Sequence, residues 1–447
     1  MKRICWVGSS NLVRSIGVAS MCLVIIGALR PADSQSLSSF DRDRGRIMLN
    51  QVKSEVKKNY YDPTFRGIDL EARFQAAEEK LKQATSNGQV FGIIAQALVD
   101  FNDSHTVFIP PNRPYRTDYG WEMQVIGDAC YVVTVKPGSD AEAKGLRVGD
   151  VVHSVDDYAL VRENLWKFRY LYYNLRPQPG MRALVQSPGD TPRQLDLMAK
   201  VEQTQVVRDL TNYVEVTRLI REQETRDRLL RPRYQEFGEQ LIIMKVPSFD
   251  LTAQQVDDVM AKVKRHKALI LDLRGNSGGS EIALLRFVSH LFDRDVKLGH
   301  LRRRSRTEPI SSRGSGDRAF KGELVLLLDS ESASASEVLA RVVQIEKRGK
   351  VIGDHTAGMV MRSVYYPLKV GVDRVVLYGV TVTDADLIMT DAKSLEKVGV
   401  TPDEELLPSA VDLAARRDPV MSRAAEIVGV RIEPERAGAM FPIEWTK

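Results

Sequence analysis

The spacing of hydrophobic positions changes along the chain, and each change predicts a different kind of structure. Between residues 36 and 112 apolar residues recur at helical spacing. In RIMLNQVKSEVKKNYYDP, for example, Leu49, Val52 and Val56 lie near one face. Two more amphipathic stretches follow before a polar turn that contains His105. This part is predicted to be an N-terminal helical region.

The pattern then shifts to short β-rich runs. Residues 113–201 contain ACYVVTV and GDVVHSV, separated by a turn and one short helix, and further strand-like runs follow a second helix. This spacing predicts a compact module of short strands and two helices. Residues 202–239 are highly charged and only weakly periodic, which indicates a connecting arm.

From residue 240 to 408, apolar strands alternate with amphipathic helices. The strands are predicted at LIIMKVPSF, ALILDLRG, ELVLLLDS and KVIGD, and helices occupy the stretches between them. Such alternation predicts a layered α/β core in which the loops after the strands carry function. Residues 409–447 are predicted to form a helical tail, so the whole chain reads as an α+β multidomain protein.

The first 34 residues have the features of a secretory signal peptide. A positive start, MKR, precedes an apolar run at residues 15–29, and Ala32-Asp33-Ser34 has the small-x-small pattern of a cleavage site. The predicted location is therefore outside the cytoplasm, either periplasmic or extracellular. An uncleaved membrane anchor is the alternative. Cleavage would leave Cys130 as the single cysteine, with no internal disulfide.

Composition limits the possible partners and cofactors. The 447 residues carry a formal net charge of +5, most of it in the leader, which argues against a nucleic-acid partner held by broad electrostatics. Neither HExxH nor a CxxC pair occurs, so no metal and no other cofactor is predicted. The basic run LRRRSR at residues 301–306 is interpreted as a solvated loop or a contact for an acidic partner.

A serine-rich turn joins a predicted strand to a predicted helix in ELVLLLDSESASASEVLARVV. Small residues would let the backbone bend sharply there and expose one hydroxyl above the helix N-terminus, where N–H groups stabilise developing negative charge. The alternative is that Ser334 or Ser336 merely caps the helix ahead of Glu337.

Two other motifs are candidates for chemistry. In LDLRGNSGGS an apolar strand runs into Asn276, Gly278 and Gly279, and the glycines allow unusual backbone angles and N–H groups that point into a site. An ordinary strand-to-helix turn is the simpler interpretation. DSHT places His105 in a polar turn. A lone histidine in a turn is more often a surface residue than a catalyst, and five other histidines compete with it.

Taken together, these motifs resemble the C-terminal processing peptidases, also called tail-specific proteases. The resemblance rests on DSHTVFIPP, KGLRVGDVV, LDLRGNSGGS, SASASEVLARVVQ and LEKVGVTPDEEL, in that order along the chain. It implies a helical N-terminal region, a PDZ domain over residues 113–201, and a protease core over residues 240–408 related to the ClpP and crotonase folds.

The resemblance also assigns roles to individual residues. The central serine of SASAS, Ser334, matches the nucleophile. The oxyanion hole falls on the backbone N–H of Ala335 and of a glycine in NSGGS, with Gly278 the better candidate and Gly279 the next. Gly120 and Trp121 are expected near the carboxylate-binding loop of the PDZ domain.

The base is where the chain departs from the usual family pattern. The family's dyad lysine matches Met359, and a thioether takes no proton. Related branches, the tricorn core protease and the chlamydial protease, use serine with histidine and glutamate instead. His105 in DSHT matches that histidine, and Glu396 in LEKVGVTPD matches the glutamate, which implies a Ser334–His105–Glu396 triad.

The predicted function is that of an exported serine endopeptidase that works through a serine ester. Its PDZ domain would help to capture unstructured or C-terminal segments of protein or peptide substrates. No nucleic acid is expected to bind, and membrane association would require an uncleaved signal anchor. One alternative is a PDZ-bearing peptide-binding scaffold without catalytic activity, because Met359 replaces the dyad lysine. A carrier for small apolar ligands is another, with no residue that points to it.

Overall fold

The structure is a computed structural model that describes residues 37–203, 229–371 and 375–442. The predicted signal peptide and the middle of the predicted connecting arm lie outside the described residues. Within the described ranges, no helix combines the length and the apolar character that crossing a membrane requires.

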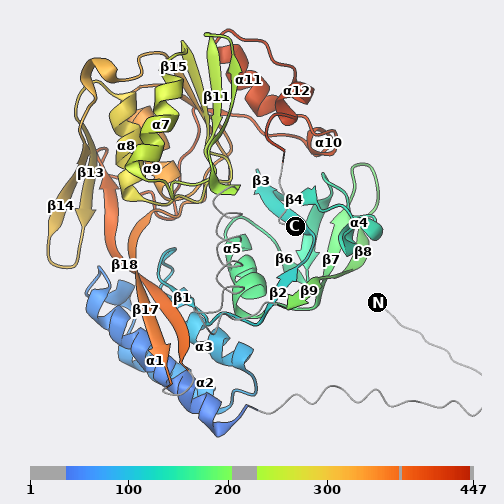
Figure 1. The fold of residues 1–447 in the computed structure, drawn as a ribbon. Helices are drawn as coiled ribbons and strands as arrows, with labels where there is room; N and C mark the ends of the chain where they lie inside the picture. Colours follow the sequence, from blue (N-terminus) through green and yellow to red (C-terminus); the bar gives the residue numbers. More distant parts are fainter. Residues whose placement is uncertain (1–36, 204–228, 372–374, 443–447) are drawn as a thin grey trace, which may run out of the picture. The chain divides into compact units, whose positions relative to one another are not determined.

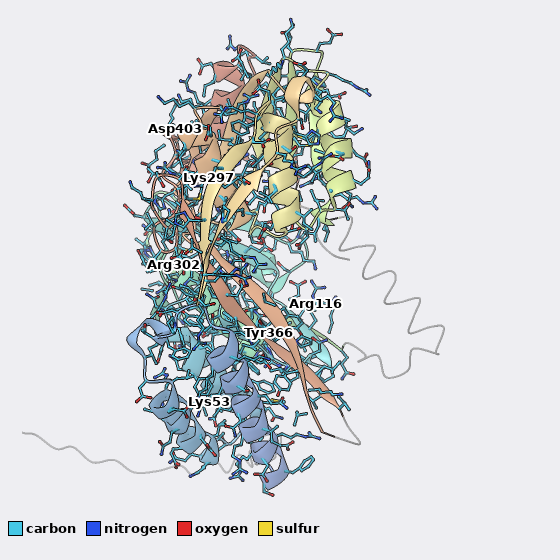
Figure 2. All side chains as sticks on the ribbon, turned by 90° about the vertical axis from the view of Figure 1, so that its left-hand side faces the viewer. Lys53, Arg116, Lys297, Arg302, Tyr366 and Asp403 are labelled. Carbon is cyan, nitrogen blue, oxygen red and sulfur yellow. The ribbon has the colours of Figure 1, made fainter. Side chains whose placement is uncertain are left out.

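Three helices follow the first described residues: α1 (Ser39–Asn59), α2 (Leu70–Lys82) and α3 (Asn87–Val99). Each has a side-chain cap at its N-terminus, provided by Ser38, Asp69 and Ser86. Their apolar faces form one core with the strands β17 (Met361–Val370) and β18 (Val376–Met389), which lie against them in Figure 1. Tyr366, labelled in Figure 2, packs against this core from β17.

The long strand β18 connects distant parts of the chain. It pairs with β1 (Val107–Ile109), with β13 (Val296–Arg302) and with β17, and β13 also pairs with β14 (Thr307–Ser312). All of these pairs are antiparallel. Because β1 directly follows the DSHT turn, its pairing with β18 fixes that turn to the sheet.

The basic run at residues 301–306 lies at the tip of the β13–β14 hairpin, and its arginines are engaged within the protein. Arg302, labelled in Figure 2, donates to Asp386 at 2.8 Å. Arg303 donates to Glu308 at 2.7 Å, and Arg304 donates to a backbone carbonyl of α1 at 2.8 Å. The run therefore stabilises the hairpin against its neighbours, and these three guanidinium groups are not simply solvated.

A second sheet occupies residues 121–198 and has its own apolar core. Its order is β3-β4-β5-β7-β8, and β6 pairs with β5. The strands are β3 (Trp121–Ile126), β4 (Ala129–Val135), β5 (Val151–Val155), β6 (Tyr158–Ala159), β7 (Gly180–Gln186) and β8 (Arg193–Met198). The helices are α4 (Asp140–Ala143), α5 (Leu165–Arg169) and the helical stretch Tyr170–Leu175. Strands β2 (Tyr115–Asp118) and β9 (Lys200–Gln203) pair with each other at the two ends of this module.

The main sheet has the order β10-β11-β12-β15-β16-β19. Its strands are β10 (Arg233–Phe237), β11 (Leu241–Lys245), β12 (Ala268–Asp272), β15 (Glu323–Leu328), β16 (Lys350–Gly353) and β19 (Glu404–Glu405). Neighbours are parallel except for β10, which is antiparallel to β11. The predicted connecting arm therefore ends in an edge strand, whose mostly exposed residues gave no apolar pattern to read.

Helices cover both faces of the main sheet (Figure 1). One face carries α7 (Ala253–Val263), α8 (Glu281–Leu291) and α9 (Ala335–Ile345). The other carries α11 (Pro419–Ile427) and α12 (Pro434–Gly438), and the short α10 (Ala410–Ala414) precedes them. Strand β12 is buried along its whole length, as expected for a parallel strand covered on both faces. The loops that leave β12 and β15 at their carboxyl ends carry the glycine and serine motifs.

Candidate active site

The serine turn has the backbone of a strained elbow. Strand β15 ends at Leu328, α9 begins at Ala335, and Ser334 between them has φ 56° and ψ −117°. A non-glycine residue rarely adopts a positive φ, and such strain is typical of functional sites. The backbone of Gly278 makes room for this elbow, because a Cβ at Gly278 would lie 2.6 Å from the Ser334 Cβ.

The three serines of SASAS have different surroundings. Ser332 and Ser336 are fully buried, and their hydroxyls donate to the carbonyls of Leu273 at 3.0 Å and Asn276 at 2.9 Å. Ser334 is only half-buried and forms a capping box with Glu337. A capping hydroxyl accepts from the helix and keeps its own proton. Among the described residues the Ser334 hydroxyl donates to no acceptor, so it is the one of the three whose proton is available.

Backbone N–H groups surround this hydroxyl, and they differ in availability. The N–H of Gly278, the first-ranked glycine of the predicted oxyanion hole, donates to Asn276 Oδ1 at 2.8 Å. Among the described residues, the N–H groups of Gly279 and Ala335 have no hydrogen-bond partner. The Asn276 amide also donates to the Val246 carbonyl at 2.8 Å, which fixes its orientation. In this conformation Gly279 and Ala335 are the two available donors.

A buried carboxylate joins the elbow to the segment that follows β16. Glu337 Oε1 accepts from the Thr356 hydroxyl at 2.6 Å and the Gly358 N–H at 2.8 Å. Its Oε2 accepts from the N–H groups of Ser334 at 2.9 Å and Met359 at 3.1 Å. Burial raises the pKa of Glu337 to about 7, although these four hydrogen bonds oppose the shift.

The DSHT turn is organised by Asp103, which is buried. Its Oδ1 accepts from the N–H groups of His105 at 2.9 Å and Thr106 at 3.0 Å, and from the Thr383 hydroxyl of β18 at 2.7 Å. Its Oδ2 accepts from the Tyr60 hydroxyl at 2.9 Å. The turn is therefore tied both to the sheet and to the N-terminal helices, which orients the half-buried His105.

Ser104 connects His105 to the buried glutamate predicted as its partner. The Ser104 hydroxyl donates to Glu396 Oε2 at 2.8 Å and lies 2.7 Å from His105 Nδ1. The Ser104 N–H donates to Glu396 Oε1 at 3.0 Å. Because the hydroxyl proton is directed to the carboxylate, its lone pair accepts from Nδ1–H, which leaves Nε2 as the basic nitrogen of His105. The contact between His105 and Glu396 is thus indirect.

The same glutamate links this turn to the serine elbow. Glu396 Oε2 also accepts from the Val360 N–H at 3.0 Å, and the Ser334 N–H donates to the carbonyl of the preceding residue, Met359, at 3.0 Å. The structure therefore brings Ser334, His105 and Glu396 into one hydrogen-bonded network. Across the described residues, no hydrogen bond joins the Ser334 hydroxyl to the His105 ring.

The protonation of His105 is set by opposing causes. Burial lowers the pKa of the imidazole and is the largest cause, whereas the Glu396 and Asp103 carboxylates raise it and the Lys397 ammonium lowers it. The net shift is downward, which favours the neutral ring at pH 7. A neutral imidazole is the form that can accept a proton.

Met359, matched by sequence to a dyad lysine, contributes through its main chain. Its N–H donates to Glu337 and its carbonyl accepts from the Ser334 N–H. The thioether side chain has no proton to exchange. Neither main-chain contact requires a lysine at this position, so both are available to any residue other than proline.

The predicted peptide-binding residues lie at the start of β3. Gly120 has φ 73°, and a Cβ there would lie 2.4 Å from the Ser139 Cβ. The Trp121 side chain is buried in the core of the module, so a ligand could reach its main chain but not its indole face. Among the described strands, β3 pairs with β4 alone, and its carbonyls at Met123 and Val125 accept from Arg169 and Ser330.

Sequence reasoning missed several residues that position the site. Three of them lie inside the motifs DSHT and SASASE: Asp103, Ser104 and Glu337. The sequence therefore showed that they lie close to His105 or Ser334. The sequence did not show their partners far along the chain. For Glu337 it anticipated the capping contact with Ser334, but not the bonds to residues 356–359. Among the described residues, no group of three or more His, Cys, Asp or Glu side chains is arranged so that it could hold a metal ion.

Comparison with protein families agrees with this geometry. Residues 240–406, which include the main sheet, both strand-end motifs and Glu396, match the model of Peptidase family S41. These residues form an S41 peptidase core. The chain is accordingly a serine peptidase, as the serine elbow indicates.

Relatives of this S41 peptidase match most of its length. The chloroplastic C-terminal processing peptidase of Tetradesmus obliquus is 26% identical over 385 residues, which cover 82% of this chain and 78% of the relative. The carboxyl-terminal-processing protease of Picosynechococcus is 22% identical over 408 residues, covering 87% of this chain and 88% of the relative. The prediction of a C-terminal processing peptidase relationship is confirmed.

Among solved structures, mature CPAF has a similar fold. It superposes with a TM-score of 0.63 at 15% identity, and the match covers 84% of this chain and 95% of that chain. The similarity therefore extends beyond the core to the arrangement of most of the S41 chain.

Proposed function

We propose that this S41 peptidase is an exported endopeptidase that cleaves peptide bonds through Ser334, His105 and Glu396, with Ser104 between the last two. His105 Nε2 takes the proton of the Ser334 hydroxyl as the oxygen attacks the peptide carbonyl, and later returns it to the leaving amine. Glu396 acts through the Ser104 hydroxyl to hold the imidazole and to stabilise its cation.

The observation that carries this proposal is the hydrogen-bond chain Glu396–Ser104–His105, which leaves Nε2 free on the ring. It supplies a base in a chain whose dyad lysine is replaced by Met359. A free hydroxyl on the strained elbow at Ser334 complements it. The two groups have to approach within hydrogen-bonding distance when substrate binds, since catalytic contacts often tighten only in the complex.

The developing oxyanion would be stabilised by main-chain N–H groups. Ala335 and Gly279 are available in the present conformation, whereas Gly278 becomes available only if its bond to Asn276 breaks. The start of α9 adds the favourable end of a helix dipole. Removing one such donor typically lowers kcat by about 10²–10³-fold.

Substrate capture is assigned to the small β module. As a PDZ domain, it would add an unstructured or C-terminal segment of a protein to the edge of β3 that β4 does not cover, in place of the contacts that Arg169 and Ser330 make to the β3 carbonyls, with the backbone around Gly120 and Trp121 near the peptide end. The predicted signal peptide supports a periplasmic or extracellular location. Protein or peptide substrates, and not nucleic acids, are the proposed partners.

The test is hydrolysis of unfolded casein by the purified protein. Ser334→Ala and His105→Ala should each lower kcat by about 10⁴-fold or more. His153→Ala is the matched control, because His153 is an exposed histidine of β5. Its activity should equal that of the wild type.

Each other outcome has a defined meaning. Peptide binding without any turnover by the wild type would favour the scaffold alternative and refute the enzyme. Full activity in His105→Ala would refute the histidine as the base and leave the S41 assignment intact.

A further inference from the structure

Lys397 lies next to Glu396, the glutamate of the proposed triad, but has no role in the triad itself. Its Nζ lies 3.7 Å from Glu396 Oε1, the oxygen that also accepts from the Ser104 N–H. The Glu396 side chain is 4% exposed, so this ammonium is a charge partner for an almost fully buried carboxylate.

The backbone and the surroundings hold Lys397 in place. It has φ 65°, and its N–H donates to the Gly358 carbonyl at 2.7 Å, one residue before Met359. On its other side, the ammonium lies 5.6 Å from the centroid of the Trp166 ring, a cation–π contact. The amine is therefore held between a carboxylate and an aromatic face, although its side chain is 34% exposed.

We propose that Lys397 is a positioning residue for the His105 base, because its ammonium binds the Glu396 oxygen that the Ser104 hydroxyl leaves unused. This inference rests on the proposed function of His105. Lys397 does not touch the reacting atoms. It compensates the buried negative charge and thereby limits how strongly Glu396 attracts a proton to the imidazole.

The charges that face His105 give the direction of the effect. Asp103 and Glu396 are negative and favour the imidazolium, and Lys397 is the positive group that opposes them. Removing the ammonium leaves both carboxylates uncompensated, so the imidazole should hold its proton more tightly. A base that stays protonated to higher pH is inactive over a wider range of acidic pH.

In this role the Lys397 amine differs from the dyad lysine that the chain lacks. An ammonium bound to Glu396 has no lone pair with which to accept the Ser334 proton. A dyad base would instead have to be neutral, and arginine could not replace it. Charge-preserving and charge-removing substitutions therefore separate the two roles.

The experiment compares Lys397→Met, Lys397→Gln and Lys397→Arg with the wild type. The first readout is the NMR titration of the His105 ring, assigned by its loss in His105→Gln. The second is kcat/KM for casein-derived peptides from pH 5 to pH 9. Circular dichroism checks that each variant is folded, and the Gln variant remains informative if the Met variant is not.

In Lys397→Met and Lys397→Gln, the His105 titration and the acidic limb of the pH profile should both move to higher pH, while the alkaline plateau changes by less than about 3-fold. Lys397→Arg should keep the wild-type profile. Unchanged titration in the Met and Gln variants would overturn the inference.

Loss of activity at every pH in all three variants, including Arg, would also overturn it, because it would indicate a lysine base. If the wild type hydrolyses nothing, the proposed function fails, but the NMR titration still decides whether Lys397 controls His105. A merely structural role would not be rescued by arginine and would not move a titration midpoint.

Discussion

The buried carboxylate of Glu337 makes folding stability depend on pH, and Glu337→Gln should remove that dependence. The side chain is fully buried and accepts four hydrogen bonds from the elbow and from residues 356–359. Burial raises its pKa to about 7, so the folded protein releases this proton near neutral pH. Glutamine has nearly the same shape and no proton to release.

The magnitude follows from the difference between the folded and unfolded states. In the unfolded chain Glu337 titrates near its ordinary pKa of 4.5, and in the folded protein near 7. At about 1.4 kcal/mol per pH unit, this difference corresponds to about 3 kcal/mol. Because the folded state binds the proton more tightly, the contribution is fully present below pH 4.5 and is lost as the pH rises to about 7.

The substitution has a second effect, which does not depend on pH. The glutamine NH₂ must face two of the four donors, and it should turn toward Thr356, whose hydroxyl can rotate and accept. The Gly358 N–H would then lack a partner, at a cost of about 1–3 kcal/mol. This cost displaces the whole stability curve of the variant without changing its slope, so the slope alone reports the carboxylate.

The assay is urea unfolding of wild type and Glu337→Gln at several pH values between 4.5 and 8 and constant ionic strength. The difference in unfolding free energy between the two should change by about 3 kcal/mol across this range, with the wild type losing stability as the pH rises. Glu323→Gln, at an exposed position of β15, is the matched control and should show no such change. A difference that stays constant for Glu337→Gln would refute the reasoning.

Substitutions at Ser104, Gly278 and Met359 test other parts of the site. Ser104→Ala should lower kcat by about 10²–10⁴-fold because the imidazole loses its orienting partner, and Ser104→Thr should retain much of the activity by keeping the hydroxyl. Gly278→Ala should unfold more readily and lose activity, since its Cβ would lie 2.6 Å from the Ser334 Cβ. Gly275→Ala is the control, because Gly275 also has a positive φ but no atom lies within 4 Å of the added Cβ. It should lower the unfolding free energy by only about 1 kcal/mol. Met359→Leu should keep kcat within about 3-fold when measured on the same peptide, since the residue acts through its main chain.

Elements buried on both faces were the easiest to predict. Strands β11, β12 and β15 are continuous apolar runs because helices cover the main sheet on both sides. The β17–β18 hairpin was missed because β17 alternates between covered and open faces and contains Pro367. Proline normally argues against a strand. In the described part of the chain, however, β17 lies at a sheet edge and pairs with β18 alone, and a missing N–H is tolerated at an edge.

The candidate residues of the site could be named from motifs, but their connections could not. Ser104 reaches Glu396 across 292 positions of sequence, and no local pattern encodes that contact. The ranking of Gly278 over Gly279 shows the same limit. Both glycines fit an oxyanion loop, and only the orientation of the Asn276 side chain distinguishes their N–H groups.

The hydrogen bonds of the site identify its reactive atoms without reference to any related protein. The buried carboxylates of Asp103, Glu337 and Glu396 are satisfied by main-chain N–H groups and hydroxyls, as buried polar groups must be. Within the described part of the site, the groups left without partners are the Ser334 hydroxyl proton, His105 Nε2 and the N–H groups of Ala335 and Gly279. These are the groups that acyl transfer requires: a nucleophile, a base and two oxyanion donors. The framework around these groups is thus saturated before substrate arrives, and the approach of the Ser334 hydroxyl to the His105 ring is the step left for substrate binding.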